Sequence, residues 1–441
     1  MKSLLLFLFI LTFSLFGQKE LLNSGLMPGY SEIREVMIWV QTKSEATVHI
    51  VYYDSKNPDR RYFSEKKITN KEKAFTAHLL ADSVDEGITY NYELFINGTM
   101  IDFPYPLTFS TQKLWQWRTD PPNFTFAAGS CAYINETVYD RPGKPYGGQY
   151  EIFNSIADKN PDFMVWLGDN VYLREADWNT RTGILHRYTH DRSLPELQKL
   201  LSSTHHYAIW DDHEYGQNNS DYTYRNKKDA LEAFKLFWGN NQYGHDDNPG
   251  IYSTFQWGDV DFFLLDNRYH RTPEFKLTGN KTILGEKQLN WLIDALASSK
   301  APFKIICLGG QFLNTAIVHE NYSTYGEEKE EILQLLHNNR IEGVFFISGD
   351  RHTAEAMKMN RKGAYPLYEV TTSPLTAGTS KAENEPNGNR IPGTYFENRN
   401  FALFSVSGPR LDRILSVKLF DTEGSEVWTL SINENDLKYK K

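Results

Sequence analysis

Residues 163–172 carry the stretch Phe163-Met164-Val165-Trp166-Leu167-Gly168-Asp169-Asn170-Val171-Tyr172, in which five apolar residues lead into a glycine and a carboxylate. A short continuous apolar run that ends in glycine is typical of a strand buried on both faces. Further runs of this kind are residues 124–129, 206–210, 262–266, 303–308 and 344–347. Apolar residues with helical spacing lie between them, in residues 150–157, 231–238, 289–296 and 332–336. This alternation predicts a layered α/β domain with its active crevice at the carboxyl ends of the strands.

The N-terminal quarter of the chain has a different pattern. From about residue 23 to 111, apolar and polar residues alternate in short stretches such as 36–40, 47–53 and 89–96, and Asn97-Gly98 is a turn signal. Period-two alternation predicts antiparallel β structure, either an immunoglobulin- or fibronectin-like sandwich or another small β sandwich. We therefore predict an N-terminal β domain over residues 18–113 and a catalytic α/β domain over residues 122–441.

Composition excludes several classes of protein. The 441 residues are 40% hydrophobic and 14% aromatic, which excludes a disordered or coiled-coil chain. Asp and Glu number 56 against 47 Lys and Arg, for a formal charge of −9. Binding of a nucleic-acid backbone by bulk charge is therefore not expected, and a nuclease of the same fold is disfavoured.

Residues 1–17 have the pattern of a cleaved signal peptide: Lys2, an apolar run over residues 4–16, and Gly17 before a polar stretch. The alternative is a membrane anchor, but about thirteen apolar residues fall short of the ~20 that span a bilayer. We expect an exported protein, periplasmic or secreted, without a transmembrane anchor.

The chain has two cysteines, Cys131 and Cys307. An oxidising compartment makes a disulfide between them one interpretation. Their settings differ, because Cys307 lies inside an apolar run, whereas Cys131 follows Gly129-Ser130 and is open to exposure at a strand tip. This difference favours separate roles.

Candidate metal ligands follow four of the predicted strands. They are Cys131, Asp169, Asp212 within the acidic cluster 211–214, and Asp350 with His352. Single motifs of this kind are common turn chemistry, but like charges in 211–214 repel unless a cation joins them. Carboxylates suit hard cations, imidazole suits iron, zinc or manganese, and thiolate suits a softer or trivalent centre. Tyr172 is either a packing aromatic or a phenolate ligand, which would indicate Fe³⁺.

One family has the same combination of motifs. The chain resembles the PhoD-like alkaline phosphatases, a branch of the calcineurin-like metallophosphoesterases, in Gly129-Ser130-Cys131, Gly168-Asp169-x-x-Tyr172, Trp210-Asp211-Asp212-His213-Glu214 and Ser348-Gly349-Asp350-x-His352. The resemblance extends over the mature chain and includes residues 265–268 and 369–373. It implies a four-layer αββα metallophosphoesterase-type domain after a small β domain, and hydrolysis of phosphomonoesters or phosphodiesters at a site with one Fe³⁺ and bound Ca²⁺. A dinuclear Mn, Zn or Mg site is the alternative.

The resemblance also implies roles for single residues. It identifies Cys131, Asp169, Tyr172, Asp350 and His352 as metal ligands. In the broader superfamily motif, Asp212 becomes a ligand and His213 the acid that faces the leaving group. An extra residue in 215–219 leaves open which asparagine reaches a metal; Asn218 is our choice over Asn219.

The implied mechanism is in-line attack of a metal-bound hydroxide on phosphorus, with Asp169 bridging the ions. Arg268 or Arg271 is a candidate for stabilising charge on the phosphate, and the alternative for Arg268 is a salt bridge to Asp266 or another acid. The substrate is expected to be a small phosphate ester or a phosphate-containing polymer. The competing function is a cell-surface module that binds carbohydrate or protein and has a structural metal site.

Overall fold

The computed structural model describes residues 19–319 and 321–440, so the predicted signal peptide lies outside the described residues. The chain divides into two compact units. The first comprises residues up to 114 together with 188–206 and 236–239, and the second comprises 115–187, 207–235 and 240 onward. The first unit thus includes residues beyond the predicted N-terminal domain. None of the described helices is both long and apolar enough to cross a membrane.

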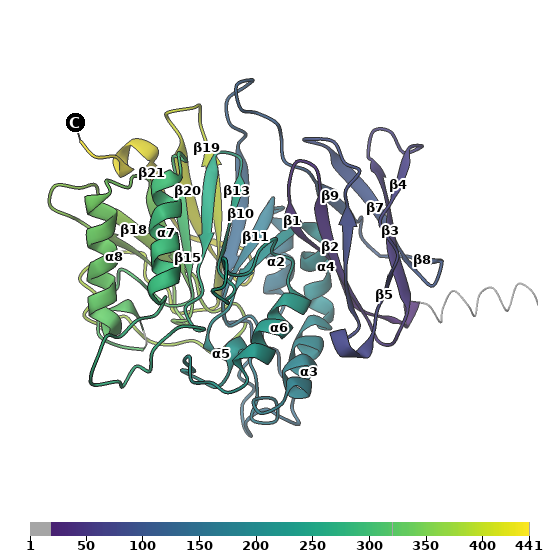
Figure 1. The fold of residues 1–441 in the computed structure, drawn as a ribbon, viewed down its shortest axis with the longest axis horizontal. Helices are drawn as coiled ribbons and strands as arrows, with labels where there is room; N and C mark the ends of the chain where they lie inside the picture. Colours follow the sequence, from purple (N-terminus) through teal and green to yellow (C-terminus); the bar gives the residue numbers. More distant parts are fainter. Residues whose placement is uncertain (1–18, 320, 441) are drawn as a thin grey trace, which may run out of the picture. The chain divides into compact units, whose positions relative to one another are not determined.

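The first unit contains two antiparallel sheets, shown in purple and blue in Figure 1. One has the order β1 (Leu22–Ser31), β2 (Val36–Thr42), β6 (Thr76–Ala81). The other has the order β4 (Arg61–Phe63), β3 (Thr47–Asp54), β7 (Thr89–Ile96), β8 (Thr99–Ile101), with β5 (Lys67–Ile68) on β3 and β9 (Thr108–Ser110) on β7. Alternate side chains of both sheets, among them Ile38, Val40, Ile50 and Leu94, form one buried core. The helix α4 (Pro195–Ser203) belongs to the same unit.

The second unit is built on two six-stranded sheets. The first sheet has the order β12 (His205–Ile209), β11 (Phe163–Leu167), β10 (Phe124–Gly129), β19 (Asn400–Ser407), β20 (Ile414–Asp421), β21 (Glu426–Asn433). The second has the order β13 (Ser253–Trp257), β14 (Val260–Leu264), β15 (Lys304–Leu308), β16 (Val344–Ser348), β18 (Leu367–Thr371), β17 (Glu355–Met359). Neighbouring strands are parallel for β10 with β11 and for β14, β15, β16 and β18. Four of the six predicted buried strands are confirmed as such, because β11, β12, β15 and β16 are buried at every residue, whereas β10 and β14 each have one partly exposed residue.

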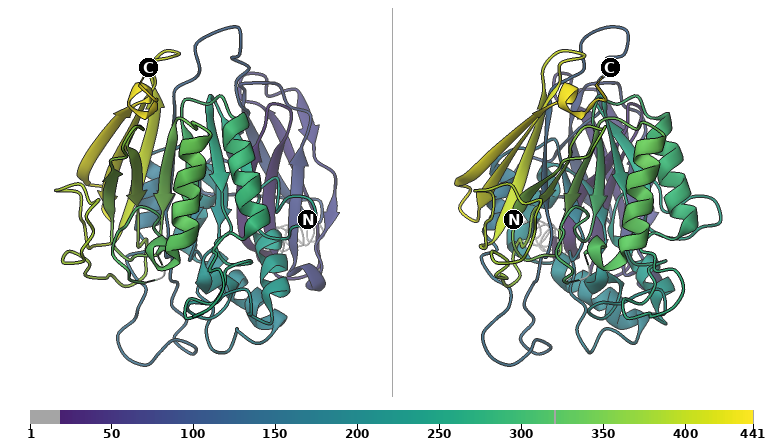
Figure 2. Two further views of the ribbon diagram at one scale, coloured as in Figure 1. Left: turned by 60° about the vertical axis from the view of Figure 1, so that its left-hand side comes forward. Right: turned by 90° about the vertical axis from the view of Figure 1, so that its left-hand side faces the viewer.

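The two sheets pack face to face through aromatic rings. Between the sheets, the ring of Phe126 in β10 meets the ring of Phe262 in β14 edge to face, with centroids 5.2 Å apart. Within the first sheet, the Phe126 ring stacks on the ring of Phe404 in β19, with centroids 4.6 Å apart. The helices α7 (Glu286–Ser298) and α8 (Gly326–Asn338) lie side by side over the strands of the second sheet (Figure 2). The helix α2 (Ile152–Asp158) packs on the outer face of the first, with Phe153 against Trp166. A mixed α/β fold with several sheets is therefore confirmed.

Other helices lie in the connections of this unit or at its boundary. They are α3 (Arg181–Arg192), α5 (Asp212–Tyr215) and α6 (Lys227–Phe237). Cys131 and Cys307 are both free and fully buried. The disulfide interpretation is therefore wrong, and so is an exposed Cys131, because Asp169 and Ser373 lie against its sulfur in the interior.

Candidate metal centre

Loops at the carboxyl ends of four strands bring four of the predicted ligands together. Cys131 follows β10, Asp169 follows β11, Asp212 follows β12 and His352 follows β16. Two groups of metal-ligand atoms result, each with its atoms within 4.8 Å of one another: Cys131, Asp169 and His352, and Asp169, Asp212 and His213. Asp169 belongs to both groups, so its carboxylate is common to the two candidate sites.

The backbone of this region is in an unusual conformation. Cys131, Asp169, Asp350 and His352 have φ values of 60°, 53°, 64° and 53°. Residues with a Cβ rarely adopt the left-handed region, and each such residue costs on the order of 1–3 kcal/mol unless its surroundings hold it there. Four of the predicted ligands share this conformation, as is typical of functional sites.

Tyr172 lies inside the first group. Its hydroxyl is 3.1 Å from Asp169 Oδ2 and 3.2 Å from His352 Nε2. Its ring lies 4.2 Å from the His213 ring, between centroids. Cys131 Sγ lies 3.6 Å from the same Asp169 oxygen. The phenol, thiol, imidazole and carboxylate therefore converge on one small buried volume.

The orientation of His352 suits metal binding. Its Nδ1 bonds to the carbonyl oxygen of Gly378, which can only accept, so Nδ1 carries the proton. The lone pair is then on Nε2, the atom that faces Tyr172. The backbone N–H of His352 donates to Ser373 Oγ at 2.9 Å, and the Ser373 hydroxyl in turn donates to Cys131 Sγ at 3.2 Å. A metal-binding histidine commonly has its other nitrogen fixed by a carbonyl in this way.

Protein groups already bind two carboxylates of the acidic cluster, which corrects the expectation that a cation joins the whole cluster. Glu214 accepts the backbone N–H groups of Asp169 at 2.8 Å and Asn170 at 2.6 Å. Asp211 accepts from Asn267 Nδ2 at 2.7 Å and from Arg268 Nε. Asp212 is the member of this cluster whose carboxylate faces the candidate centre.

Arg268 is buried and paired with acids. Besides its bond to Asp211, its Nη2 lies 3.7 Å from Asp212 Oδ1. Arg268 therefore forms a salt bridge, as the alternative interpretation expected, and its partner is Asp211 rather than Asp266. Arg271 is also buried, and its guanidinium lies 4.5 Å from the Tyr325 ring centroid.

The asparagine and Asp350 assignments have less geometric support. Asn218 is exposed, and its side-chain amide donates to Asn219 Oδ1. This segment reaches the second group through the Asn219 N–H, which lies 2.7 Å from Asp212 Oδ2. The Asp350 carboxylate is in neither group, while its carbonyl oxygen lies 3.7 Å from Cys131 Sγ.

The electrostatics favour a cation at this place. Burial, and then the charge of Asp212, raises the pKa of Asp169 well above its usual range. Burial raises the pKa of Cys131 to about 12 and also raises that of Tyr172. Burial acts in the same direction on Asp212, but His213 and Arg268 outweigh it and lower the pKa of that carboxyl. A bound cation reverses such shifts because it stabilises thiolate, phenolate and carboxylate.

One orphaned atom also fits a metal. Asp212 Oδ1 is buried and has no hydrogen-bond partner among the described residues, and its ion-pair partner Arg268 Nη2 lies 3.7 Å away. A buried polar atom without a partner is rare in folded proteins, and a bound ion can satisfy such an atom. The mixed oxygen, nitrogen and sulfur donor set matches the predicted mixed centre.

Several residues that shape the centre are not among those predicted from the sequence. Ser373 and Gly378 fix His352, and Glu214 holds the Asp169 loop. Tyr146 lies with its hydroxyl 3.3 Å from His352 Nδ1. No local sequence pattern indicates the roles of Ser373, Gly378 and Tyr146. Glu214 is the exception, because an acidic residue three positions after Asp211 is typical of a capping box at the start of a helix.

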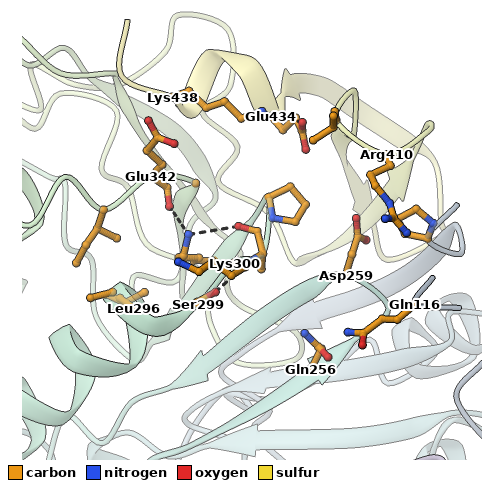
Figure 3. Close-up of a pocket in the computed structure, with 18 of the residues that line it drawn as sticks. Gln116, Gln256, Asp259, Leu296, Ser299, Lys300, Glu342, Arg410, Glu434 and Lys438 are labelled. Atoms are coloured by element: carbon orange, nitrogen blue, oxygen red, sulfur yellow. Dashed lines mark hydrogen bonds and ion pairs between the residues drawn. The ribbon is translucent and has the colours of Figure 1, made fainter. Parts of the chain in front are cut away.

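Cavities in the second unit differ in how close they lie to these residues. A pocket of about 660 Å³ is lined by Tyr146, Gly378 and Arg399 and thus adjoins His352. A larger cavity of about 910 Å³ lies where β14, β15 and β16 begin, and Figure 3 shows Asp259, Lys300 and Glu342 in its lining. The larger cavity contains none of the predicted site residues, so size does not identify the functional site.

Comparisons with known proteins identify the family of the chain and proteins that share its fold. A family model described as PhoD-like phosphatase matches residues 126–406. Alkaline phosphatase D of Bacillus subtilis is 22% identical over 372 residues, an alignment that covers 72% of this chain and 61% of that relative.

Two solved structures share the fold. A structure of PhoD has a TM-score of 0.75 at 16% identity, covering 94% of this chain and 90% of that chain. A purple acid phosphatase from yellow lupin seeds, PPD1, has a TM-score of 0.67 at 12% identity, covering 93% of this chain and 74% of that chain.

Proposed function

The chain belongs to the PhoD-like phosphatase family, and we propose that it is a metal-dependent phosphoric ester hydrolase. The observation that carries this proposal is the pair of ligand groups that share Asp169. Two adjacent cation sites suit the binding of a phosphate group and its transfer to water. Its substrates on this proposal are phosphomonoesters, phosphodiesters or phosphate-containing polymers.

The donor chemistry suggests which ion each group holds. Cys131, Tyr172, His352 and Asp169 suit Fe³⁺, and the oxygens of Asp169 and Asp212, with Asp350 and Asn218 as further candidates, suit Ca²⁺. A dinuclear Mn, Zn or Mg site is the alternative. Metal ions here would neutralise charge on the phosphate and lower the pKa of water.

Side chains of the protein then position and protonate the ester. His213 is the proposed acid for the departing oxygen, because its ring is held against Tyr172 and its backbone N–H donates to Asp169 Oδ1 at 3.3 Å. Arg268 positions Asp211 and Asp212 rather than touching substrate. Glu214 holds the backbone of Asp169.

The test compares Asp169→Asn with Asp259→Asn. Asp259 is also a buried carboxylate, but it pairs with Arg413 and lines the larger cavity (Figure 3). We expect Asp169→Asn to lose bound metal and to lower hydrolysis of a chromogenic phosphate ester at least about 10³-fold, since removal of a shared ligand costs several kcal/mol of charge stabilisation. Asp259→Asn is expected to retain metal and activity. Hydrolysis by Asp169→Asn at the wild-type rate would exclude the assignment.

Domain organisation and export are further parts of this proposal. Residues 1–17 are a signal peptide, residues 18–113 an immunoglobulin- or fibronectin-like sandwich, and residues 122–441 the catalytic domain, and the protein acts in the periplasm or outside the cell. The pattern of residues 4–16 supports export. A binding module with a structural metal site is the competing function, and it predicts metal without turnover in the same assay.

A further inference from the structure

Tyr146 lies beside the candidate centre, with its hydroxyl 3.3 Å from His352 Nδ1. Its ring packs edge to face on Tyr133, 5.0 Å away, and lies 6.0 Å from the His352 ring and 6.5 Å from the Tyr172 ring. At Gly378 an added Cβ would come within 2.5 Å of the Tyr146 ring, so the absence of a side chain there lets the ring lie at this position. The phenol is therefore held in one orientation.

The hydroxyl proton of Tyr146 has no acceptor within the described part of the chain. Its one hydrogen-bond contact there is His352 Nδ1 at 3.3 Å. That nitrogen also bonds to the Gly378 carbonyl, which accepts and cannot donate. Nδ1 therefore carries a proton directed at Gly378, and Tyr146 cannot donate to it. The O–H is free to donate elsewhere.

The surroundings of the hydroxyl indicate where that donor is used. Tyr146 is 46% exposed and lines the pocket of about 660 Å³ that also contains Gly378 and Arg399. A phosphate group at the two ligand groups would enter beside a fixed O–H donor. Fixed donors aimed at a phosphoryl oxygen are a common way to stabilise its charge.

We propose that Tyr146 contacts the substrate, donating a hydrogen bond from its hydroxyl to a phosphoryl oxygen of the bound ester, and that the adjoining pocket is the entrance for tetrahedral oxyanions. This inference rests on the proposed phosphoesterase function. It assigns to the chain a substrate-binding residue that is not a metal ligand and that does not act through His352.

The experiment compares Tyr146→Phe with Tyr139→Phe, a tyrosine of the same 46% exposure whose ring contacts His186. Binding of inorganic phosphate to the metal-loaded protein is measured by calorimetry, together with metal content, thermal unfolding and kcat/KM for a chromogenic ester. We expect Tyr146→Phe to weaken phosphate binding and to lower kcat/KM by about 10- to 100-fold, the usual effect of one hydrogen bond to a charged group. Metal content and unfolding temperature are expected to stay unchanged, and Tyr139→Phe is expected to behave as wild type.

Two results would overturn the proposal. Unchanged phosphate affinity in Tyr146→Phe would show that the hydroxyl does not touch the oxyanion. Loss of metal in step with loss of affinity would show that Tyr146 only positions His352. Because phosphate binding does not require turnover, a wild-type protein that binds phosphate but hydrolyses no ester would contradict the proposed function while leaving the contact of Tyr146 with the oxyanion testable.

Discussion

Glu214→Gln tests how the Asp169 loop is held. The carboxylate is buried and accepts three backbone N–H groups: Oε2 accepts Asp169 at 2.8 Å and Asp211 at 3.1 Å, and Oε1 accepts Asn170 at 2.6 Å. Glutamine retains one acceptor oxygen and brings an amide that can only donate. If its oxygen takes the Oε2 position, the Asn170 N–H faces another donor and remains unsatisfied.

The number of hydrogen bonds lost or weakened gives the expected change in the free energy of unfolding. One buried unsatisfied N–H costs roughly 1–3 kcal/mol, and the two remaining bonds lose charge assistance worth about 1 kcal/mol each. We expect Glu214→Gln to lower the free energy of unfolding by about 3–5 kcal/mol. Because the loop carries Asp169, we also expect metal affinity to fall about 10- to 100-fold, as for other groups that support metal ligands.

The matched control is Glu328→Gln. Glu328 is a buried carboxylate that accepts the N–H groups of Ile283 at 2.6 Å and Leu284 at 3.2 Å, and it belongs to neither ligand group. Urea unfolding of the metal-free proteins, metal titration and ester hydrolysis would be measured for both variants. Both should lose stability, and only Glu214→Gln should lose metal affinity and activity. Equal metal affinity in the two variants would refute the reasoning.

Two further predictions concern buried ionisable side chains. Arg268→Met leaves Asp211 and Asp212 without their guanidinium and is expected to destabilise the protein by about 3–5 kcal/mol in urea unfolding, so a loss below about 1 kcal/mol would contradict the pairing. Burial lowers the pKa of His205 to about 4 and that of His206 to about 3. Their contribution to stability is therefore present above pH 6.5 and is lost as pH falls towards 4 and 3, by about 2 kcal/mol each at pH 5. Replacing both with Gln should flatten the fall in urea midpoint between pH 7 and pH 5, and an equal fall in the variant would contradict this account.

Much of the fold followed from local patterns. Residues 124–129 were predicted as a strand and coincide with β10, and residues 163–167 coincide with β11. A strand buried on both faces is mostly apolar along its whole length, so its sequence indicates it without knowledge of its neighbours. The strands β19, β20 and β21 escaped prediction because the predicted strands were the continuously apolar runs, whereas these three alternate buried with partly exposed residues.

For the candidate centre, the sequence by itself determined which donor types follow which strands, because ligand chemistry belongs to single side chains and their place in a motif. Tertiary structure alone decided how each acid is used: Asp212 faces the centre, Asp211 pairs with Arg268 and Glu214 binds backbone N–H groups. These three residues are neighbours in one short cluster, so no local pattern separates them. Their partners lie tens of residues away, and only the folded chain brings an arginine, a loop or a ligand group against one carboxylate rather than the next.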